Sequence, residues 1–288
     1  MKPAPFTYHD PKSVTDLVGM LNTLEDVKIL AGGQSLMPML NMRFVLPDHV
    51  IDINKITDLQ FIHYENDRLQ IGAMTRQCDL LSSDTILLQC PIMVEALQMV
   101  GHFQTRNRGT IGGSICHLDP AAELPVITSL YDATLNIVGP DGERQINFAD
   151  WPLAYMMPNL AHEEVLTSIE FPVWQEPHGY AFVEFARRHG DFAIVAVACL
   201  LSVDELGKIT KVALTVAGAN ISPVRLAEVE NALIGEKAES DTFSAAAKTA
   251  QKIETMGDAY YTAAYRTRLV GILVERALKQ ATKRMNGA

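Results

Sequence analysis

Two glycine-rich segments carry the residue types and spacing that suggest chemistry. The first is Leu30-Ala-Gly-Gly-Gln-Ser-Leu-Met-Pro38, and the second is Gly109-Thr-Ile-Gly-Gly-Ser114. A glycine pair lets backbone N–H groups turn towards an anion with no Cβ in the way. The hydroxyls of Ser35, Thr110 and Ser114 can add hydrogen bonds to phosphate oxygens. Two such segments at one site could hold the diphosphate of a dinucleotide.

Each Gly-Gly pair also has a simpler interpretation as a tight turn, which general turn frequencies favour for either segment alone. Neither segment matches GxGxxG or GxxxxGK[ST], the patterns of the Rossmann dinucleotide site and the P-loop. The residues alone therefore leave open whether these segments bind a phosphate or only reverse the chain.

The elements that must position these segments follow from hydrophobic spacing. A strand over 27–30 runs into the first segment, and a helix beginning after Ser35 would add its partial positive charge. The polar, basic and then glycine-rich stretch 102–113 is predicted to be a loop. Asp119-Pro120 is predicted to begin a helix with three apolar side chains on one face, Leu124, Ile127 and Leu130.

The pattern changes after a predicted linker over 174–179. Three strand-like runs follow, over 180–186, 192–203 and 209–217, and they predict an antiparallel meander; the remaining chain has helical spacing. We expect an α+β fold with an N-terminal subdomain over 1–56, a middle subdomain over 57–176 and a C-terminal domain over 177–288. That last domain should pack a three-stranded antiparallel sheet against helices.

Composition and charge exclude several classes of protein. With 48% hydrophobic and 20% charged residues the chain can bury a core, so it is not a disordered chain. The 34 acidic residues against 24 basic ones give a net charge of -10, which argues against nucleic acid as a partner. The longest apolar run, over 192–203, is shorter than the roughly 20 residues of a membrane span. The N-terminus has no apolar leader, so a cytoplasmic protein is expected.

Metal-binding and nucleophilic patterns do not stand out. The four cysteines are widely spaced with no CxxC, and the eight histidines include no HExxH. No Ser/His/Asp arrangement is visible either. We therefore predict no metal site and no catalytic acid, base or nucleophile on this chain.

The two segments in context resemble a known family. AGGQSLMPMLNMR followed by IDIN, and RGTIGGSI followed by DPAAELP, are similar to the FAD-binding medium subunits of the molybdenum hydroxylases, the family of carbon monoxide dehydrogenase, xanthine dehydrogenase and quinoline 2-oxidoreductase. The resemblance covers essentially the whole chain. Within the family the chain looks nearest to subunits of N-heterocycle hydroxylases such as quinoline 2-oxidoreductase.

The resemblance implies a vanillyl-alcohol-oxidase-type FAD-binding fold and specific roles for residues. Glu123 matches an acidic position that bonds a polar part of FAD, and Leu166 matches an apolar residue against the isoalloxazine ring. Asp119 is either a polar contact near the cofactor or a helix N-cap. Many relatives have His in place of Gln34 and Asn in place of Ser114, which puts local geometry in doubt. The two segments supply the remaining FAD-binding positions: Ala31, Gly32, Gly33, Gln34, Ser35, Leu36, Thr110, Ile111, Gly112, Gly113 and Ser114.

The resemblance also implies a function in electron transfer. In the family, substrate is hydroxylated at a molybdenum cofactor on a large subunit, and electrons pass through two [2Fe–2S] clusters on a small subunit to the FAD. The flavin then reduces an external acceptor. The implied complex is a dimer of heterotrimers, with an N-heterocyclic aromatic such as quinoline as the expected substrate. A self-sufficient FAD-dependent oxidoreductase of related fold is the alternative, and a scaffold subunit without flavin is another.

Two charged loops keep more than one interpretation. The turn from Arg187 to Asp191 is either a solvated hairpin or a loop near the flavin that gates the electron acceptor. His102, Arg106 and Arg108 could balance diphosphate charge, face a partner subunit or simply be solvated. The sequence does not identify the substrate or the acceptor.

Overall fold

The computed structural model describes residues 1–285 and begins with a small parallel sheet in the order β1-β3-β2. Ser13 caps the first helix by accepting a hydrogen bond from the Asp16 N–H at 3.1 Å, as its position before the apolar run predicts. Leu17 packs with Val165 of the next unit, so this first unit is fixed to the rest of the chain. Its elements are β1 (Thr7–His9), α1 (Val14–Thr23), β2 (Val27–Leu30), α2 (Leu36–Asn41) and β3 (His49–Asp52).

A five-stranded antiparallel sheet forms the middle of the molecule, in the order β4-β5-β10-β6-β7. A short hairpin, β8 and β9, lies beside it. The strands are β4 (Ile62–Glu65), β5 (Arg68–Gly72), β6 (Thr134–Gly139), β7 (Gly142–Asn147), β8 (Pro152–Ala154), β9 (Met157–Pro158) and β10 (Val165–Pro172).

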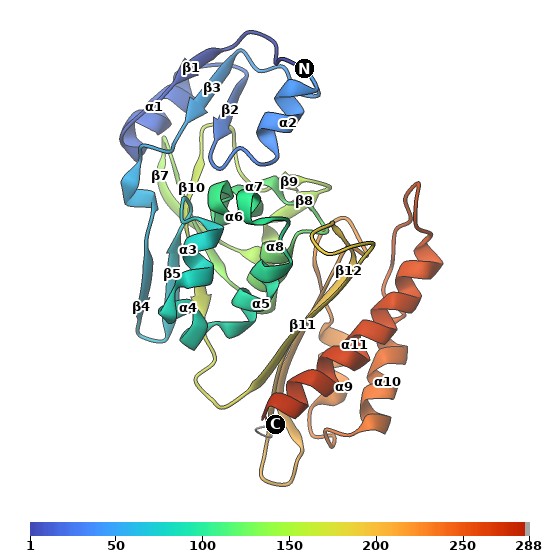
Figure 1. The fold of residues 1–288 in the computed structure, drawn as a ribbon. Helices are drawn as coiled ribbons and strands as arrows, with labels where there is room; N and C mark the ends of the chain where they lie inside the picture. The colour runs from blue at the N-terminus through green and yellow to red at the C-terminus, as the bar shows by residue number, and fades with distance from the viewer. Residues whose placement is uncertain (286–288) are drawn as a thin grey trace.

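Six short helices gather on one side of this sheet and bury its apolar face (Figure 1). They are α3 (Gln77–Ser82), α4 (Asp84–Gln89), α5 (Pro91–Met99), α6 (Phe103–Arg108), α7 (Ile111–His117) and α8 (Glu123–Leu130); two 3-10 turns, η1 (Thr57–Leu59) and η2 (Phe148–Asp150), complete the unit. The second glycine segment begins α7, which lies at the end of this unit nearest to the first unit, below it in Figure 1.

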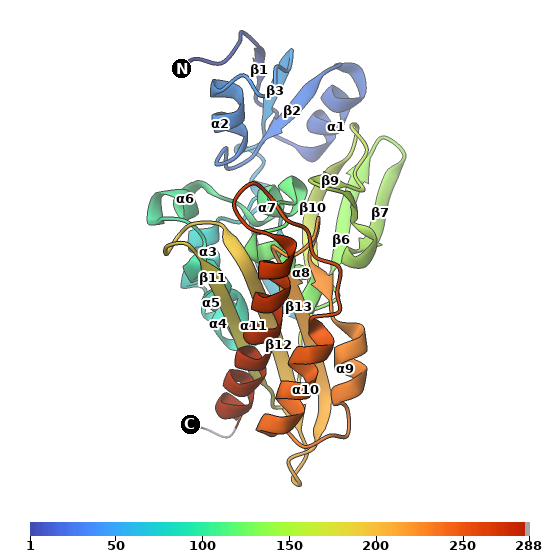
Figure 2. The same cartoon turned by 90° about the vertical axis from the view of Figure 1, so that its right-hand side faces the viewer.

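The last part of the chain forms a long antiparallel sheet and packs its own helices on one face of it. These helices lie in front of the strands in Figure 2. Alternate side chains of β12 belong to two different cores, one facing α5 and α8 and the other facing α10 and α11. The elements are β11 (Gly179–Ala186), β12 (Ala193–Val203), β13 (Ile209–Ala217), β14 (Val224–Arg225), α9 (Ala227–Leu233), α10 (Ser240–Ala250) and α11 (Ala263–Met285).

The α+β class and the C-terminal meander are confirmed, and three details differ from expectation. Most of the stretch 102–113 is helical, in α6 and in the start of α7. Thr110 caps α7, and close packing of the second glycine segment allows its glycines to lie inside a helix. The predicted meander gains β14 as a short fourth strand, since Pro223 precedes an extended pair rather than helix.

Within residues 1–285, no helix combines the length and apolarity that crossing a membrane requires.

Asp119 does not begin a helix. Leu118 adopts a left-handed conformation that ends α7, and the Asp119 carboxylate then accepts the Ala121 N–H at 2.8 Å within a turn. The next helix starts only at Glu123. Its apolar face is as predicted, with Leu124 and Ile127 buried. The N-cap interpretation of Asp119 is therefore wrong for α8.

Candidate functional site

The two glycine segments lie against each other. A Cβ on Gly32 would collide with the carbonyl oxygen of Arg108 and lie 2.9 Å from the Gly109 Cα. A Cβ on Gly113 would lie 3.7 Å from the Ala31 Cβ. The tertiary structure thus joins two segments that lie about 75 residues apart in the chain, and glycine is what permits the approach.

The first segment presents a row of unused donors. No described residue accepts a hydrogen bond from the five consecutive backbone N–H groups of residues 32–36. Gly33 adopts φ 71°, which turns the chain between β2 and α2. The Ser35 hydroxyl makes no capping bond to α2, so it also remains available. Clustered free N–H groups with a nearby hydroxyl are suited to an anion.

The second segment uses its donors internally. The first three N–H groups of α7 all donate to protein oxygens: Ile111 to the Thr75 carbonyl at 3.1 Å, Gly112 to the Ala73 carbonyl at 2.8 Å and Gly113 to the Thr110 hydroxyl at 3.1 Å. Thr110 is only 2% exposed. The second segment therefore forms a closely packed surface beside the first one. Its Ser114 hydroxyl has no partner among the described side chains.

A polar bridge joins the two segments. The Asn54 amide donates to the Ala31 carbonyl at 2.9 Å, and Arg76 donates both to the Asn54 amide oxygen and to the Arg108 carbonyl. Asn54 follows β3, and Arg76 follows β5, so each unit contributes one side of the bridge. The bridge fixes the distance between the first segment and the start of α7.

Arg76 and Arg108 bring positive charge to this bridge, and the Asp52 carboxylate is the acidic group near both of them. Within residues 1–285, Arg76 makes no salt bridge, and its hydrogen-bond acceptors are neutral. Burial, followed by the neighbouring Arg108, lowers the pKa of Arg76. Two cations beside free N–H groups fit a doubly charged diphosphate, which would compensate both.

Asp52 lies next to the bridge, where its carboxylate accepts a hydrogen bond from the Asn54 amide. Burial acts to raise its pKa, but hydrogen bonds from Asn54 and Tyr8 outweigh that effect and hold the pKa below its usual value. The carboxylate is therefore ionised and orients Asn54 towards Ala31.

Of the other predicted contacts, Leu166 and Glu123 are buried and Gln34 is exposed. Leu166 is 3% exposed on β10, next to an irregularity in the pairing with β6, so only an edge of it can meet a ligand. Glu123 is 8% exposed at the start of α8, and burial, together with the charge of Glu184, raises its pKa to about 8. Gln34 is exposed and its amide donates to the Gly32 carbonyl at 3.1 Å.

Two residues that join the segments were not predicted from the sequence: Asn54 and Arg76. Asn54 ends the IDIN strand that accompanies the first segment, so its position was visible but its role was not. Arg76 carries no sequence signal, because what distinguishes it is a contact with a distant part of the chain.

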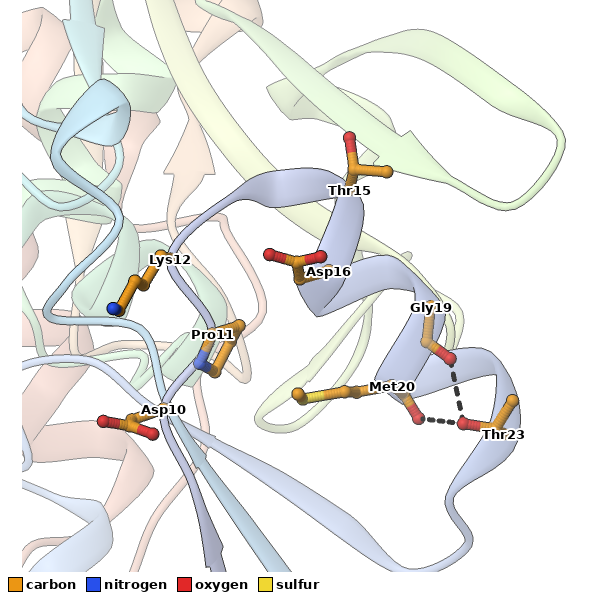
Figure 3. A pocket seen from close by; sticks show the side chains of 8 residues that line it. All are labelled: Asp10, Pro11, Lys12, Thr15, Asp16, Gly19, Met20 and Thr23. Carbon is orange, nitrogen blue, oxygen red and sulfur yellow. Dashed lines mark hydrogen bonds between the residues drawn. The ribbon is translucent and has the colours of Figure 1, made fainter.

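A separate hollow lies at the start of α1 and contains none of these residues (Figure 3). It has a volume of about 510 Å³ and is lined by Asp10, Lys12, Thr15, Asp16 and their neighbours. Asp10 is paired with Lys55, and the Thr23 hydroxyl donates to the Gly19 and Met20 carbonyls. Asp10 and Thr23 thus already have partners within the protein.

The row of free donors beside two arginines is the kind of site that suits an anionic group. Residues 4–174 match the family model described as the FAD binding domain in molybdopterin dehydrogenase, and residues 180–281 match the CO dehydrogenase flavoprotein C-terminal domain. The chain belongs to this family of FAD-binding oxidoreductase subunits.

Similar proteins match along their full length. The 6-hydroxypseudooxynicotine dehydrogenase complex subunit alpha of Paenarthrobacter nicotinovorans is 38% identical, over 99% of this chain and 97% of that protein. Carbon monoxide dehydrogenase from Hydrogenophaga pseudoflava superposes with a TM-score of 0.95 at 36% identity, covering 99% of both chains. Quinoline 2-oxidoreductase from Pseudomonas putida 86 gives the same TM-score at 29% identity, also over 99% of both.

Proposed function

We propose that this chain holds FAD with the cofactor's diphosphate on the first glycine segment. The observation that carries the proposal is the row of five free N–H groups in a segment that packs against Arg108, whose carbonyl accepts a hydrogen bond from Arg76. Residues 31–36 would bind the phosphates, and residues 110–114 would close the other side, where the Ser114 hydroxyl is free while the Thr110 hydroxyl caps α7. Asp119 and Glu123 would contact polar parts of the cofactor, and Leu166 would meet the isoalloxazine ring.

The proposed role of the bound flavin is to pass electrons to an external acceptor. FAD supplies redox chemistry that can take up electrons singly and release them as a pair. This chain's residues bind the cofactor, orient it and exclude water from it. In this proposal two [2Fe–2S] clusters lie on a small partner subunit and the molybdenum cofactor lies on a large one. The relatives' names support this, since they describe a medium chain or a subunit of a dehydrogenase complex.

The complex is proposed to be a cytoplasmic dimer of heterotrimers that hydroxylates an N-heterocyclic aromatic such as quinoline. Relatives named for caffeine and nicotine support a heterocyclic substrate, at 35% and 33% identity. Relatives named for carbon monoxide and glyceraldehyde show that the family also serves other substrates. Within the chain, 1–56 and 57–176 are proposed as the two halves of the FAD-binding part, with 177–288 as the third domain.

Substrate-driven flavin reduction tests this function. The absorbance spectrum of the purified chain should show flavin without iron–sulfur absorption, and N-heterocycles should leave it unchanged. When the small and large subunits are added, the same substrates should bleach the flavin. Bleaching in the chain alone would favour the self-sufficient oxidoreductase, and a purified chain that binds no FAD would contradict the proposal.

A further inference from the structure

Two side-chain amides hold backbone carbonyls of the first glycine segment. The Asn54 amide donates to the Ala31 carbonyl at 2.9 Å, and the Gln34 amide donates to the Gly32 carbonyl at 3.1 Å. A peptide group is planar and trans, so its carbonyl and its N–H point to opposite sides. Holding the Ala31 carbonyl therefore fixes the direction of the Gly32 N–H. Holding the Gly32 carbonyl fixes the direction of the Gly33 N–H in the same way.

The start of α2 holds two further peptide groups of this segment. The Met37 N–H donates to the Gly33 carbonyl at 3.2 Å, and the Met39 N–H donates to the Ser35 carbonyl at 3.2 Å. Each bond fixes the direction of the next free N–H along the chain. Among the described residues these backbone bonds begin at Gly33, so the two peptide groups in front of it depend on the side-chain amides.

Nothing on the N–H side holds those two peptide groups. Neither the Gly32 N–H nor the Gly33 N–H donates to a described residue. Glycine has no Cβ to oppose rotation of a peptide group beside it, and the second of these groups joins two glycines. A rotated group would present its carbonyl oxygen where the N–H now points, and that oxygen would repel an anion. The side-chain amides therefore keep a donor in both positions.

The amide of Asn54 is itself fixed in one orientation. Its N–H groups donate to the Asp52 carboxylate, the backbone one at 2.9 Å, and its oxygen accepts a hydrogen bond from Arg76. A reversed amide would place its NH2 against the Arg76 donor and its oxygen against the Ala31 carbonyl. Tyr8 donates to the other carboxylate oxygen of Asp52 at 2.8 Å, so the group that holds Asn54 is held in turn.

We propose that Asn54 and Gln34 are positioning residues that aim the Gly32 and Gly33 N–H groups at the diphosphate of FAD by holding the carbonyls of the same peptide groups. This inference rests on the proposed function and assigns one side chain to each donor. Donors that are already aimed lose little freedom when the ligand binds, so holding them raises affinity. Asn54 should have the larger effect, because its amide is fixed at both ends whereas Gln34 is exposed.

Amide NMR of the isotope-labelled chain tests the proposal without relying on activity. In the wild type, the Gly32 and Gly33 N–H groups should exchange quickly with water and slow by at least about tenfold with saturating FAD. Asn54→Leu should remove this protection from Gly32 and leave it at Gly33, and Gln34→Leu should do the reverse. Absorbance confirms that each variant holds its flavin. Protection of both amides in both variants would overturn the proposal, as would loss of both in a variant that holds FAD.

Titration of flavin-free protein with FAD ranks the two positions. Asn54→Leu should weaken FAD binding by about tenfold and Gln34→Leu by about threefold, as expected for misaiming one hydrogen-bond donor to a charged group. The matched controls are Asn220→Leu and Gln175→Leu, which each remove a side-chain bond to a backbone carbonyl, at 3.2 and 3.4 Å, outside the glycine segments. Both controls should bind FAD as the wild type does. Wild-type affinity in Asn54→Leu and Gln34→Leu would overturn the inference.

The wild-type chain separates this inference from the proposed function. If FAD changes no amide signal of residues 32–36 in the wild type, the diphosphate lies elsewhere and the proposed function fails. If FAD protects these amides in the wild type and in both variants alike, the function stands and the positioning role fails. Gln34→Leu lies on an exposed turn and should fold as the wild type does, so it decides the question even where Asn54→Leu is unstable.

Discussion

The two glycine segments look alike in sequence and differ in what they do in the structure. The first leaves five backbone N–H groups free and bends at Gly33 with a positive φ. The second donates its N–H groups to Thr75, Ala73 and Thr110 and has no positive φ between 109 and 114. A Gly-Gly pair thus leaves backbone donors free in one case and forms a close-packing surface in the other.

The physical reason lies in what each glycine touches. A Cβ on Gly112 would lie 2.6 Å from the Ala73 Cβ and 2.7 Å from the Ala73 carbonyl oxygen, so Gly112 is needed for packing. A Cβ on Gly33 would meet only the Leu30 and Met37 side chains, each at 3.1 Å, so Gly33 is needed chiefly for its backbone conformation.

The largest expected effect is that of Gly112→Val. The added side chain would press on the backbone of β5, because a buried helix cannot move away without breaking its bond to Ala73. We expect a loss of about 3 kcal/mol or more in stability, together with loss of flavin. Thermal unfolding and flavin absorbance measure both. Gly19→Val in α1, where nothing lies within 4 Å of the added Cβ, is the control. A Gly112→Val protein as stable as that control would show that the second segment is not a packing surface.

Gly33→Ala should separate conformational strain from binding. Gly33 and Gly207 have φ of 71° and 75°, so alanine at either position costs about 1 kcal/mol of backbone strain. Only Gly33 belongs to the row of free donors, so only Gly33→Ala should also reduce flavin affinity, by about tenfold. Unfolding by urea and titration of flavin-free protein with FAD measure the two effects. Equal flavin affinity in the two variants would remove the first segment from the diphosphate site.

Arg76→Gln tests the bridge and its charge. Glutamine can keep one hydrogen bond but removes the cation, so FAD should bind about tenfold more weakly and the affinity should depend less on salt. Arg68→Gln, which disrupts an exposed pair with Glu170, is the matched control. Unchanged affinity and unchanged salt dependence would mean that Arg76 only holds the units together.

The smallest effects come from the two hydroxyls. Thr110→Ala removes the cap of α7 and should cost about 1 kcal/mol of stability. Ser35→Ala removes a hydroxyl that makes no capping bond, so stability should be unchanged while FAD affinity falls by a few fold. Unfolding and FAD titration of both variants provide the measurements. A stability loss in Ser35→Ala equal to that in Thr110→Ala would erase the difference between the segments.

Much of the fold follows from local patterns in the sequence. The strand before Ala31, the cap at Ser13 and the long C-terminal meander appear where hydrophobic spacing and capping residues place them. The stretch 102–113 was misassigned because its glycines and charges have low helix propensity. Packing against Ala73 and the cap from Thr110 outweigh that propensity.

The sequence by itself determined the family pattern, the α+β class and the two segments that could meet a phosphate. Only the tertiary structure decided which segment keeps its N–H groups free and that Arg76 bridges the two. Backbone conformation depends on neighbours in the chain and can be inferred from them. Free donors, unpaired charges and raised pKa values depend on what lies nearby in space, and that is fixed only when distant segments pack together.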